Sequence, residues 1–402
     1  MRRLLLGITA IVIPLILVLA VAEVALRIQP SLIGVALLDR FPTNLKSEIA
    51  SRLGLPTGAD FRLVPSAERF DKGPDLFLPK PNSQSMLPPE VADAALGAID
   101  RRESDERGFC NPPGKLSGGS ADLVVIGGSV PSCVGVDANG LFATLLGPTS
   151  GLRTYDMTVG GVGPYEYVEV LRRFGMALKP RIVVMAFSEA NDLRDCKRYE
   201  DHLAGKKYTH RLKREWSWPF NMSYALSFLK SGGEFAVRTV KRGLGEDFTY
   251  TVEVLGKRRP MNIRNGDKDE LEAAKAFAQG LLSVSICEPA LSAFAQLGKE
   301  NGFLPVVMAT PAAHTVYRRS VLFKNPEFGP LLGTFDDSQR DWLAKNAARI
   351  GYRYIDIVEE LQIRAASSPL LYFPSNAHLT VDGHKLLAEI IGPKLKQILE
   401  NP

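Results

Sequence analysis

The 402-residue chain has only four cysteines, and none of them stands in a C-x-x-C spacing. Structural zinc sites need closely spaced cysteine and histidine ligands, so a zinc site is not expected. A Walker loop and a G-x-G-x-x-G segment after a strand are also missing, which leaves nucleotide binding without support. The formal net charge is only +5, and the basic residues are dispersed. We therefore predict a protein with no cofactor, no metal and no nucleic-acid partner.

Charge is absent from nineteen consecutive residues near the amino terminus, Leu4–Ala22. A helix needs about 20 apolar residues to cross the hydrocarbon core of a bilayer. Arg2 and Arg3 precede the run, which favours a cytoplasmic amino terminus and places the rest of the chain outside. A cleaved signal peptide is the alternative, because Ala20-Val21-Ala22 has the form A-x-A. The length of the run favours a retained transmembrane anchor over residues 4–26.

Long regular elements are not expected in residues 27–120, because prolines interrupt this part of the chain repeatedly. Short helices are predicted at Asn44–Leu53 and Pro89–Asp100. We interpret residues 27–120 as a stalk and wrapping segment that leads from the membrane to a core.

From Ala121 onward, strand patterns alternate with helix patterns, which predicts an α/β protein with helices on both faces of a parallel sheet. Helices are expected at Gly140–Leu146 and Tyr165–Ala177. The expected strands are Leu123–Gly127, Arg153–Val159, Arg181–Phe187, Phe303–Ala309 and Tyr352–Ile357.

The connection between the third and fourth strands is unusually long for a compact domain, and such connections are usually lids or insertions. It is expected to hold a hairpin around Thr249–Ile263 and a long helix from Asp267 onward. The third part of the chain is therefore a domain over residues 121–402 with an insertion at about 193–301.

Three of the expected strands end in small or polar residues: Gly127-Gly128-Ser129, Gly160–Gly163 and Asn191-Asp192. Ligands of parallel sheets bind outside the carboxyl ends of the strands. Ser129 is placed there like a nucleophile, while glycine N–H groups and an asparagine amide supply donors for an oxyanion. A histidine base is expected within Tyr372–His384. Turn formation alone is the competing interpretation, because Gly, Asn and Asp dominate turns.

These motifs resemble the SGNH, or GDSL-like, hydrolase family over residues 121–402, with the insertion unaligned. The matching blocks are IGGS with Ser129 as nucleophile, DMTVGGVGP with Gly161, EAND with Asn191, and SNAHLTVDGHKLLAE with His378 as base. The resemblance implies a three-layer flavodoxin-like fold. It also implies an oxyanion hole made by the backbone N–H groups of Ser129 and Gly161 together with Asn191. The fragments PKPN and RGFCNP resemble segments that precede the domain in membrane-anchored bacterial members.

Two departures from the family pattern bear on catalysis. Gly128 replaces the usual Asp of the first block, and Ser375 and Asn376 stand where the family has an Asp before the histidine. Asn376 can orient the imidazole through its amide oxygen, but it lacks the charge that stabilises imidazolium. A Ser–His dyad, an acid from elsewhere such as Asp195, or no catalysis remain open. His384, in a D-G-H run, is a rival base.

The resemblance implies an extracytoplasmic, membrane-anchored serine esterase or O-acyltransferase of a bacterial inner membrane, with its domain in the periplasm or outside the cell. The expected substrates are ester-bearing carbohydrates, above all O-acetylated ones, and lipid esters are the second choice. The competing hypothesis is a catalytically degenerate relative that binds glycan or acts in envelope assembly. The sequence leaves the oligomeric state open.

Disulfides are permitted outside the cytoplasm. Cys110, Cys133 and Cys196 are expected near the same rim of the sheet, so at most one bridge is predicted among them, with Cys110–Cys196 preferred. Cys287 is interpreted as a buried free thiol. The remaining histidines, His314 among them, are interpreted as structural or exposed.

Overall fold

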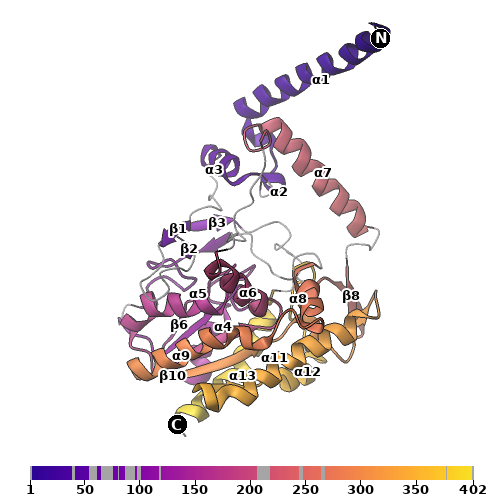
Figure 1. Cartoon of the computed structure of the whole chain (residues 1–402). Coiled ribbons are helices and arrows are strands. Elements are labelled where there is room, and N and C mark those ends of the chain that lie inside the picture. Colours follow the sequence, from indigo (N-terminus) through magenta and orange to yellow (C-terminus); the bar gives the residue numbers. More distant parts are fainter. Residues whose placement is uncertain are drawn as a thin grey trace.

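A five-stranded parallel sheet with helices on both faces forms the centre of the protein, and an amino-terminal helix projects away from it (Figure 1). The structure is a computed structural model of the chain. It describes residues 2–38, 41–53, 61–64, 76–79, 81–86, 96, 101–116, 119–205, 218–243, 248–263, 268–376 and 378–400.

The strands of this sheet run in the order β12-β10-β7-β5-β6. All neighbouring pairs are parallel, as predicted. The first strand in sequence therefore lies between the second and the third, which is the strand order of flavodoxin-like folds. The strands are β5 (Leu123–Gly127), β6 (Thr154–Asp156), β7 (Ile182–Ser188), β10 (Leu304–Thr310) and β12 (Arg353–Ile355).

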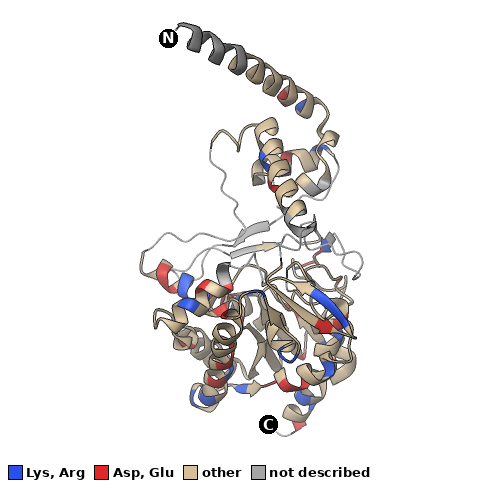
Figure 2. Ribbon diagram, turned by 90° about the vertical axis from the view of Figure 1, so that its right-hand side faces the viewer, with Lys and Arg blue, Asp and Glu red and all other residues tan. Residues whose placement is uncertain are grey.

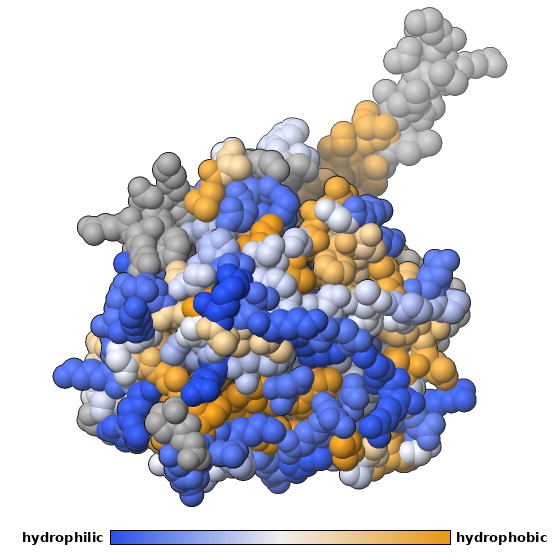
Figure 3. All heavy atoms as spheres, turned by 60° about the horizontal axis from the view of Figure 1, so that its bottom comes forward, coloured by the Kyte–Doolittle hydropathy of each residue, from blue (hydrophilic) through white to orange (hydrophobic). Residues whose placement is uncertain are grey.

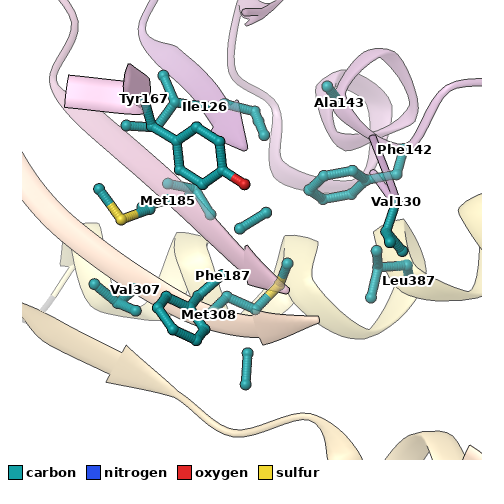
Figure 4. Packing of buried hydrophobic residues seen from close by; sticks show 14 of the residues in the cluster. Ile126, Val130, Phe142, Ala143, Tyr167, Met185, Phe187, Val307, Met308 and Leu387 are labelled. Carbon is teal, nitrogen blue, oxygen red and sulfur yellow. The ribbon is translucent and has the colours of Figure 1, made fainter. Parts of the chain in front are cut away.

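The two central strands, β5 and β7, are buried along their whole length. Their apolar, largely β-branched residues fit a strand that is covered on both faces. Figure 4 shows Ile126 of β5 and Met185 of β7 in this core, with Val307 of β10 nearby. Burying each such side chain stabilises the fold by about 1.5–3 kcal/mol.

Helices α4 (Phe142–Ser150) and α13 (Val381–Glu400) pack against each other in one outer layer. The other layer contains α5 (Pro164–Val170), α9 (Glu288–Asn301) and α11 (Phe328–Ile350), which contact one another in sequence order. The remaining helix of the carboxyl-terminal part, α12 (Val358–Ala365), packs on α13.

Strand β6 is shorter than the predicted Arg153–Val159, although the Met157 and Val159 N–H groups still donate to carbonyls of β5. A side chain occupies the outer edge of β6. Asn111 Oδ1 accepts from the Asp156 N–H at 2.8 Å, and Asn111 Nδ2 donates to the Asp156 carbonyl at 3.0 Å. This amide bonds to the strand backbone as a neighbouring strand would. It therefore occupies hydrogen-bonding groups at the exposed edge of the sheet.

The insertion contains the predicted hairpin, formed by β8 (Tyr250–Val254) and β9 (Lys257–Met261) and extended by β11 (Leu322–Phe323). The single long helix expected from Asp267 is wrong. Helix α8 (Lys268–Ala278) ends before Gly280, whose φ of +70° breaks the helix. A new helix, α9, begins after a short 3₁₀ turn, with a proline in its first turn.

The wrapping segment contributes two small antiparallel ladders, β1 (Phe61–Val64) with β2 (Leu76–Pro79) and β3 (Gln84–Met86) with β4 (Arg101–Glu103). The helix predicted at Pro89–Asp100 lies outside the described residues, apart from residue 96.

The amino-terminal helix α1 (Arg2–Ile28) leads into α2 (Val35–Leu38) and α3 (Thr43–Arg52), the last close to its predicted position. Within the described part of the chain, no helix is both long enough and apolar enough to cross a membrane. These helices meet α7 (Tyr224–Gly243) of the insertion around a second, smaller core. The stalk and the insertion, far apart in sequence, therefore pack on each other (Figure 1).

The cysteine prediction is correct only in that one bridge joins two of the three cysteines Cys110, Cys133 and Cys196; the preferred pair Cys110–Cys196 and the free Cys287 are wrong. The structure contains two disulfides, Cys110–Cys133 and Cys196–Cys287, and no free cysteine. Cys287 does not lie inside a helix as expected; it ends a 3₁₀ turn directly before α9 and faces α6 (Asp192–Leu203). The distance of each cysteine from a motif in the sequence therefore did not identify its disulfide partner. The pairing depends on how the insertion folds back onto the rest of the domain.

Candidate active site

Ser129 lies just beyond the carboxyl end of β5, at the point where the strand order reverses. Strand β5 has β6 on one side and β7 on the other. The crevice between the loops that follow β6 and β7 therefore opens beside Ser129. Ser129 is 7% exposed. A Cβ built on Gly160, in the loop after β6, would lie 3.4 Å from the Ser129 Cβ. The glycine-rich loop therefore directly borders the candidate nucleophile, as predicted from the strand ends.

Gly128 has no room for the aspartate that the resembling family carries. A Cβ at this position would lie 2.6 Å from the hydroxyl of Tyr167 on α5. That hydroxyl donates to Asp192 Oδ1 at 2.8 Å, and both side chains are buried. The departure from the family pattern thus coincides with a Tyr167–Asp192 pair that fills the same space.

Two links hold the loop that follows Ser129. The Ser132 hydroxyl donates to the Ser129 carbonyl at 2.9 Å, and Cys133 is bonded to Cys110 in the wrapping segment. The wrapping segment is itself pinned to the sheet, since Tyr155 of β6 donates to Asp105 Oδ2 at 2.6 Å. The RGFCNP fragment therefore braces the nucleophile loop.

The loop after β6 is built around Gly161, whose φ of +81° favours glycine. The Gly161 carbonyl accepts from Arg198 Nη2 of α6 at 3.3 Å. Gly163 N–H donates to Glu166 Oε2 at 3.0 Å, and a Cβ on Gly163 would lie 2.5 Å from the Asp195 Cβ. Helix α6 thus fixes the path of the glycines that are predicted to offer oxyanion donors.

Asn191 lies where the sequence predicts, at the N-cap of α6 and 5% exposed, but its amide faces carboxylates. Its Nδ2 donates to Asp195 Oδ2 at 2.8 Å and to Asp192 Oδ1 at 3.2 Å, while its Oδ1 accepts from the Ser188 hydroxyl. Carboxylates only accept, so the orientation of the amide is fixed. A role in an oxyanion hole requires Asn191 to exchange one of these partners for substrate.

His378 is held by Asn376 in a defined tautomer. The His378 backbone N–H donates to Asn376 Oδ1 at 2.9 Å, and the ring Nδ1 lies 3.0 Å from the same oxygen. A backbone N–H can only donate, so the atom that faces it must be the amide oxygen. The ring Nδ1 therefore carries a proton, and Nε2 of the neutral ring presents a lone pair, as a general base requires.

His384, the rival base, has a different environment. It is completely buried, and its Nδ1 accepts from the Phe142 N–H of α4 at 3.2 Å. Burial lowers the pKa of His384 to about 3. This ring is a neutral acceptor that joins α13 to α4, and the D-G-H alternative loses its support.

A small cavity connects the segments that carry the predicted site residues. Its volume is about 10 Å³, close to that of one water-sized probe. Val130, next to Ser129, and Ala190, next to Asn191, line it together with Ile263. The neighbouring Asn262 N–H donates to the Pro374 carbonyl at 2.8 Å, in the loop that leads to His378. The nucleophile loop, the Asn191 turn and the His378 loop thus converge at one edge of the sheet.

Comparison of the sequence finds no matching family profile and no matching curated protein. Solved structures of low similarity do match. One is a GDSL-like lipase from Bacteroides thetaiotaomicron, with a TM-score of 0.34, 10% identity, and coverage of 69% of this chain and 88% of the lipase. Another is a lipase/acylhydrolase from Enterococcus faecalis, with a TM-score of 0.33, 12% identity, and coverage of 69% and 96%.

A third similar structure is the catalytic domain of a peptidoglycan O-acetyltransferase from Streptococcus pneumoniae, with a TM-score of 0.30, 13% identity, and coverage of 70% of this chain and 97% of that domain. All three TM-scores are below 0.5, so we argue the function from the site alone.

A buried cluster that the sequence did not predict borders the same cavity. His314 Nε2 lies 2.8 Å from Glu270 Oε1 of α8, and His314 Nδ1 lies 3.5 Å from Asp336 Oδ2 of α11. Burial would lower the pKa of His314, but these carboxylates outweigh it and raise the pKa to about 9. Burial raises the pKa of Asp336 to about 8. The three side chains are close enough to one another to hold a metal ion, and His314 is hydrogen-bonded to Glu270.

Further residues that the sequence reasoning missed hold the Asn191 turn in place. Glu189, in the same turn, is fully buried; its Oε1 accepts from Arg340 of α11 at 2.5 Å, and its Oε2 accepts from the Ala312 N–H at 3.3 Å. The sequence did contain a sign of these contacts, because Glu189 stands among small and polar residues at the end of a strand. A buried acid requires a partner.

Proposed function

We propose that the protein is a membrane-anchored, extracytoplasmic serine esterase or O-acyltransferase. The observation that carries the proposal is the Asn376–His378 pair, because it sets the ring tautomer that a general base needs. We propose that this ring faces Ser129. The predicted roles of Ser129, His378 and Gly161 are part of the proposal.

In the proposed reaction His378 Nε2 takes the proton from Ser129 Oγ as this oxygen attacks an ester carbonyl. The backbone N–H groups of Ser129 and Gly161 stabilise the oxyanion. When the tetrahedral intermediate collapses, the C–O bond to the alcohol breaks, and the imidazolium gives its proton to the leaving oxygen. Water or a sugar hydroxyl then takes the acyl group and restores Ser129.

We propose a short acyl group, acetyl above all. The cavity beside Val130 and Ala190 is small, with room for about one water molecule, and this favours a short acyl group. Carbohydrate esters are the proposed substrates, with lipid esters second.

We also propose that α1 anchors the protein in a bacterial inner membrane. The uncharged run Leu4–Ala22 supports this, as do the exposed apolar side chains of the described part of α1, such as Leu17 and Val18. Figure 2 shows charges on this part of α1 only toward the end near the body.

The test is hydrolysis of p-nitrophenyl acetate, butyrate and hexanoate by the purified chain. Turnover should fall steeply from acetate to hexanoate, and Ser129→Ala should reduce it to the uncatalysed rate while thermal unfolding stays unchanged. Ser150→Ala, at a buried serine of α4, is the matched control and should retain activity. Full turnover by a folded Ser129→Ala variant would refute the proposed nucleophile.

A second candidate function, glycan binding without catalysis, also has a specific observation in its favour. The group that holds the His378 ring at Nδ1 is the uncharged amide of Asn376, and the Asn191 amide is engaged by Asp192 and Asp195. This second function predicts that the purified chain binds O-acetylated glycan without hydrolysing it or transferring its acetyl group.

A further inference from the structure

Helix α7 of the insertion has an exposed apolar stripe that faces away from the core it shares with α1. Leu229, Val237 and Val240 are 58%, 56% and 61% exposed. Their spacings of eight and three residues place them on one side of a helix. Tyr224 and Ala225 belong to the buried side, in the small core formed with α1, α2 and α3. An unpartnered stripe of this kind marks a contact surface.

The start of α7 is held at the end of the uncharged run of α1. Glu23 Oε2, in the first charged residue after that run, accepts from the Ser223 hydroxyl and from the Ala225 N–H, each at 2.8 Å. Arg27 Nη2 donates to the Met222 carbonyl at 2.9 Å, and its guanidinium lies 4.7 Å from the centre of the Tyr224 ring. The carboxylate at the α7 amino terminus also suits the helix dipole.

This junction fixes how deep α7 lies relative to the membrane. If residues 4–22 cross the hydrocarbon core, Glu23 lies at the level of the lipid headgroups, and the first turn of α7 lies there with it. Trp218 and Met222, just before α7, are 76% and 63% exposed at the same junction. Tryptophan is enriched at this level of membranes. Figure 3 shows the described part of α1 as an apolar rod beyond the body, and α7 starts at its inner end (Figure 1).

The charge of α7 fits an anionic lipid surface. Its sequence Tyr224–Gly243 contains four basic residues and one acidic residue. Lys230, at an exposed position, lies directly beside Leu229 of the stripe. Helices with an apolar stripe and a basic remainder lie in the interface between headgroups and acyl chains.

We propose that the α7 stripe, with Trp218 and Met222, lies in the surface of an anionic bilayer and forms a second membrane contact beside the anchor. This inference rests on the anchor proposed above. Two contacts at an angle restrict rotation of the domain about α1, so the active-site edge keeps a constant orientation to the membrane.

The test uses the full chain in vesicles of phosphatidylethanolamine and phosphatidylglycerol. Because all four native cysteines are in disulfides, a single introduced cysteine can be labelled with bimane. The labelled variants are Leu229→Cys and Val237→Cys on the stripe, Val18→Cys on α1, and Leu255→Cys on the β8–β9 turn as an equally exposed control. Each is measured with brominated acyl chains and with aqueous iodide.

Labels on the stripe should be quenched by brominated lipid at least several-fold more strongly than the Leu255 label, and they should be shielded from iodide. Vesicles of phosphatidylcholine alone should weaken this quenching. If the Val18 label is in lipid while the stripe labels behave like the Leu255 label, the inference is wrong and the anchor stands. If the stripe labels are shielded from iodide but are not quenched by brominated lipid, they face a protein partner, and the inference is also wrong. A Val18 label in water overturns both the anchor and the inference.

Discussion

At His378 a single amide oxygen accepts two hydrogen bonds, one from the backbone N–H and one from the ring. Replacing the orienting Asp of a serine protease by Asn cost about 10⁴ in turnover because the histidine adopted the wrong tautomer. Here the backbone N–H prevents the amide from turning, so the tautomer is correct. What Asn376 lacks is only the negative charge that stabilises imidazolium.

Replacement of Asn376 by Asp should therefore increase ester hydrolysis. A carboxylate keeps both accepted hydrogen bonds and adds the missing charge, so we expect a gain of at least about 10-fold in kcat. Asn376→Ala, which removes both acceptors, is the control and should lower kcat. Steady-state kinetics on p-nitrophenyl acetate measure the effect. An unchanged rate in the Asp variant would mean that another group already stabilises the ring.

Individual residues also show which contacts could be predicted from the sequence and which could not. Ser129, Asn191 and His378 were predicted because each stands in a short motif at an element end, and the Asn376 contact followed from local spacing. Tyr167 was not predicted, because its link to Asp192 joins two helices that approach only in the fold. The engagement of Asn191 by Asp195 was also missed, although both residues belong to the start of α6 and their i, i+4 spacing is visible in the sequence.

At the scale of elements, both disulfides brace loops that carry candidate site residues. Cys110–Cys133 holds the loop after Ser129, and Cys196–Cys287 holds α6, which begins at the Asn191 turn. The strands were predictable from apolar runs and alternation, whereas the flavodoxin-like fold was implied only by the family resemblance. The pairing of cysteines was not predictable, because it depends on where the insertion returns to the sheet.

Removal of the Cys196–Cys287 bridge should destabilise the protein more than removal of the other bridge. The two bridges span 91 and 23 residues. Loop-closure entropy predicts a loss of about 4 kcal/mol in unfolding free energy for the longer loop and about 1 kcal/mol less for the shorter one. Urea unfolding of the Cys196→Ser/Cys287→Ser and Cys110→Ser/Cys133→Ser variants measures both losses. Non-reducing peptide mapping that finds Cys110 bonded to Cys196 contradicts the structure.

At the scale of the whole molecule, the buried cluster of Glu270, His314 and Asp336 joins the insertion to the sheet and to α11. Glu189 and Arg340 extend this network to the Asn191 turn. The sequence predicted an insertion but not this polar contact between it and the core, since no motif marks which charges meet. Because burial and the neighbouring charges raise the pKa values of His314 and Asp336, the contribution of the cluster to stability depends on pH.

The free energy of unfolding should fall as the pH rises from about 6.5 to about 9. The folded-state pKa of His314 is raised to about 9, so the folded protein binds more protons than the unfolded chain in this window. The stabilisation is complete below the unfolded pKa of about 6.5 and is lost as the pH passes the folded value. The raised pKa of Asp336 acts with the same sign between about pH 3.8 and about pH 8, so it overlaps the lower part of the His314 window.

The measurement is urea unfolding from pH 6 to pH 9.5, with His314→Gln and a control, His202→Gln on α6. Above about pH 8, where Asp336 no longer contributes, the slope should flatten in the His314 variant and persist in the control. Equal slopes in the parent and in His314→Gln would mean that the imidazole does not exchange its proton on unfolding.

The central claim, that Ser129 is a nucleophile activated by His378, is tested most directly with a fluorophosphonate probe. The purified chain, with both disulfides intact, is treated with the probe and mapped by mass spectrometry. We predict a single adduct on Ser129 that is absent in Ser129→Ala and forms far more slowly in His378→Ala. A folded parent protein that remains unmodified at Ser129 would contradict the claim and leave the non-catalytic function as the better account.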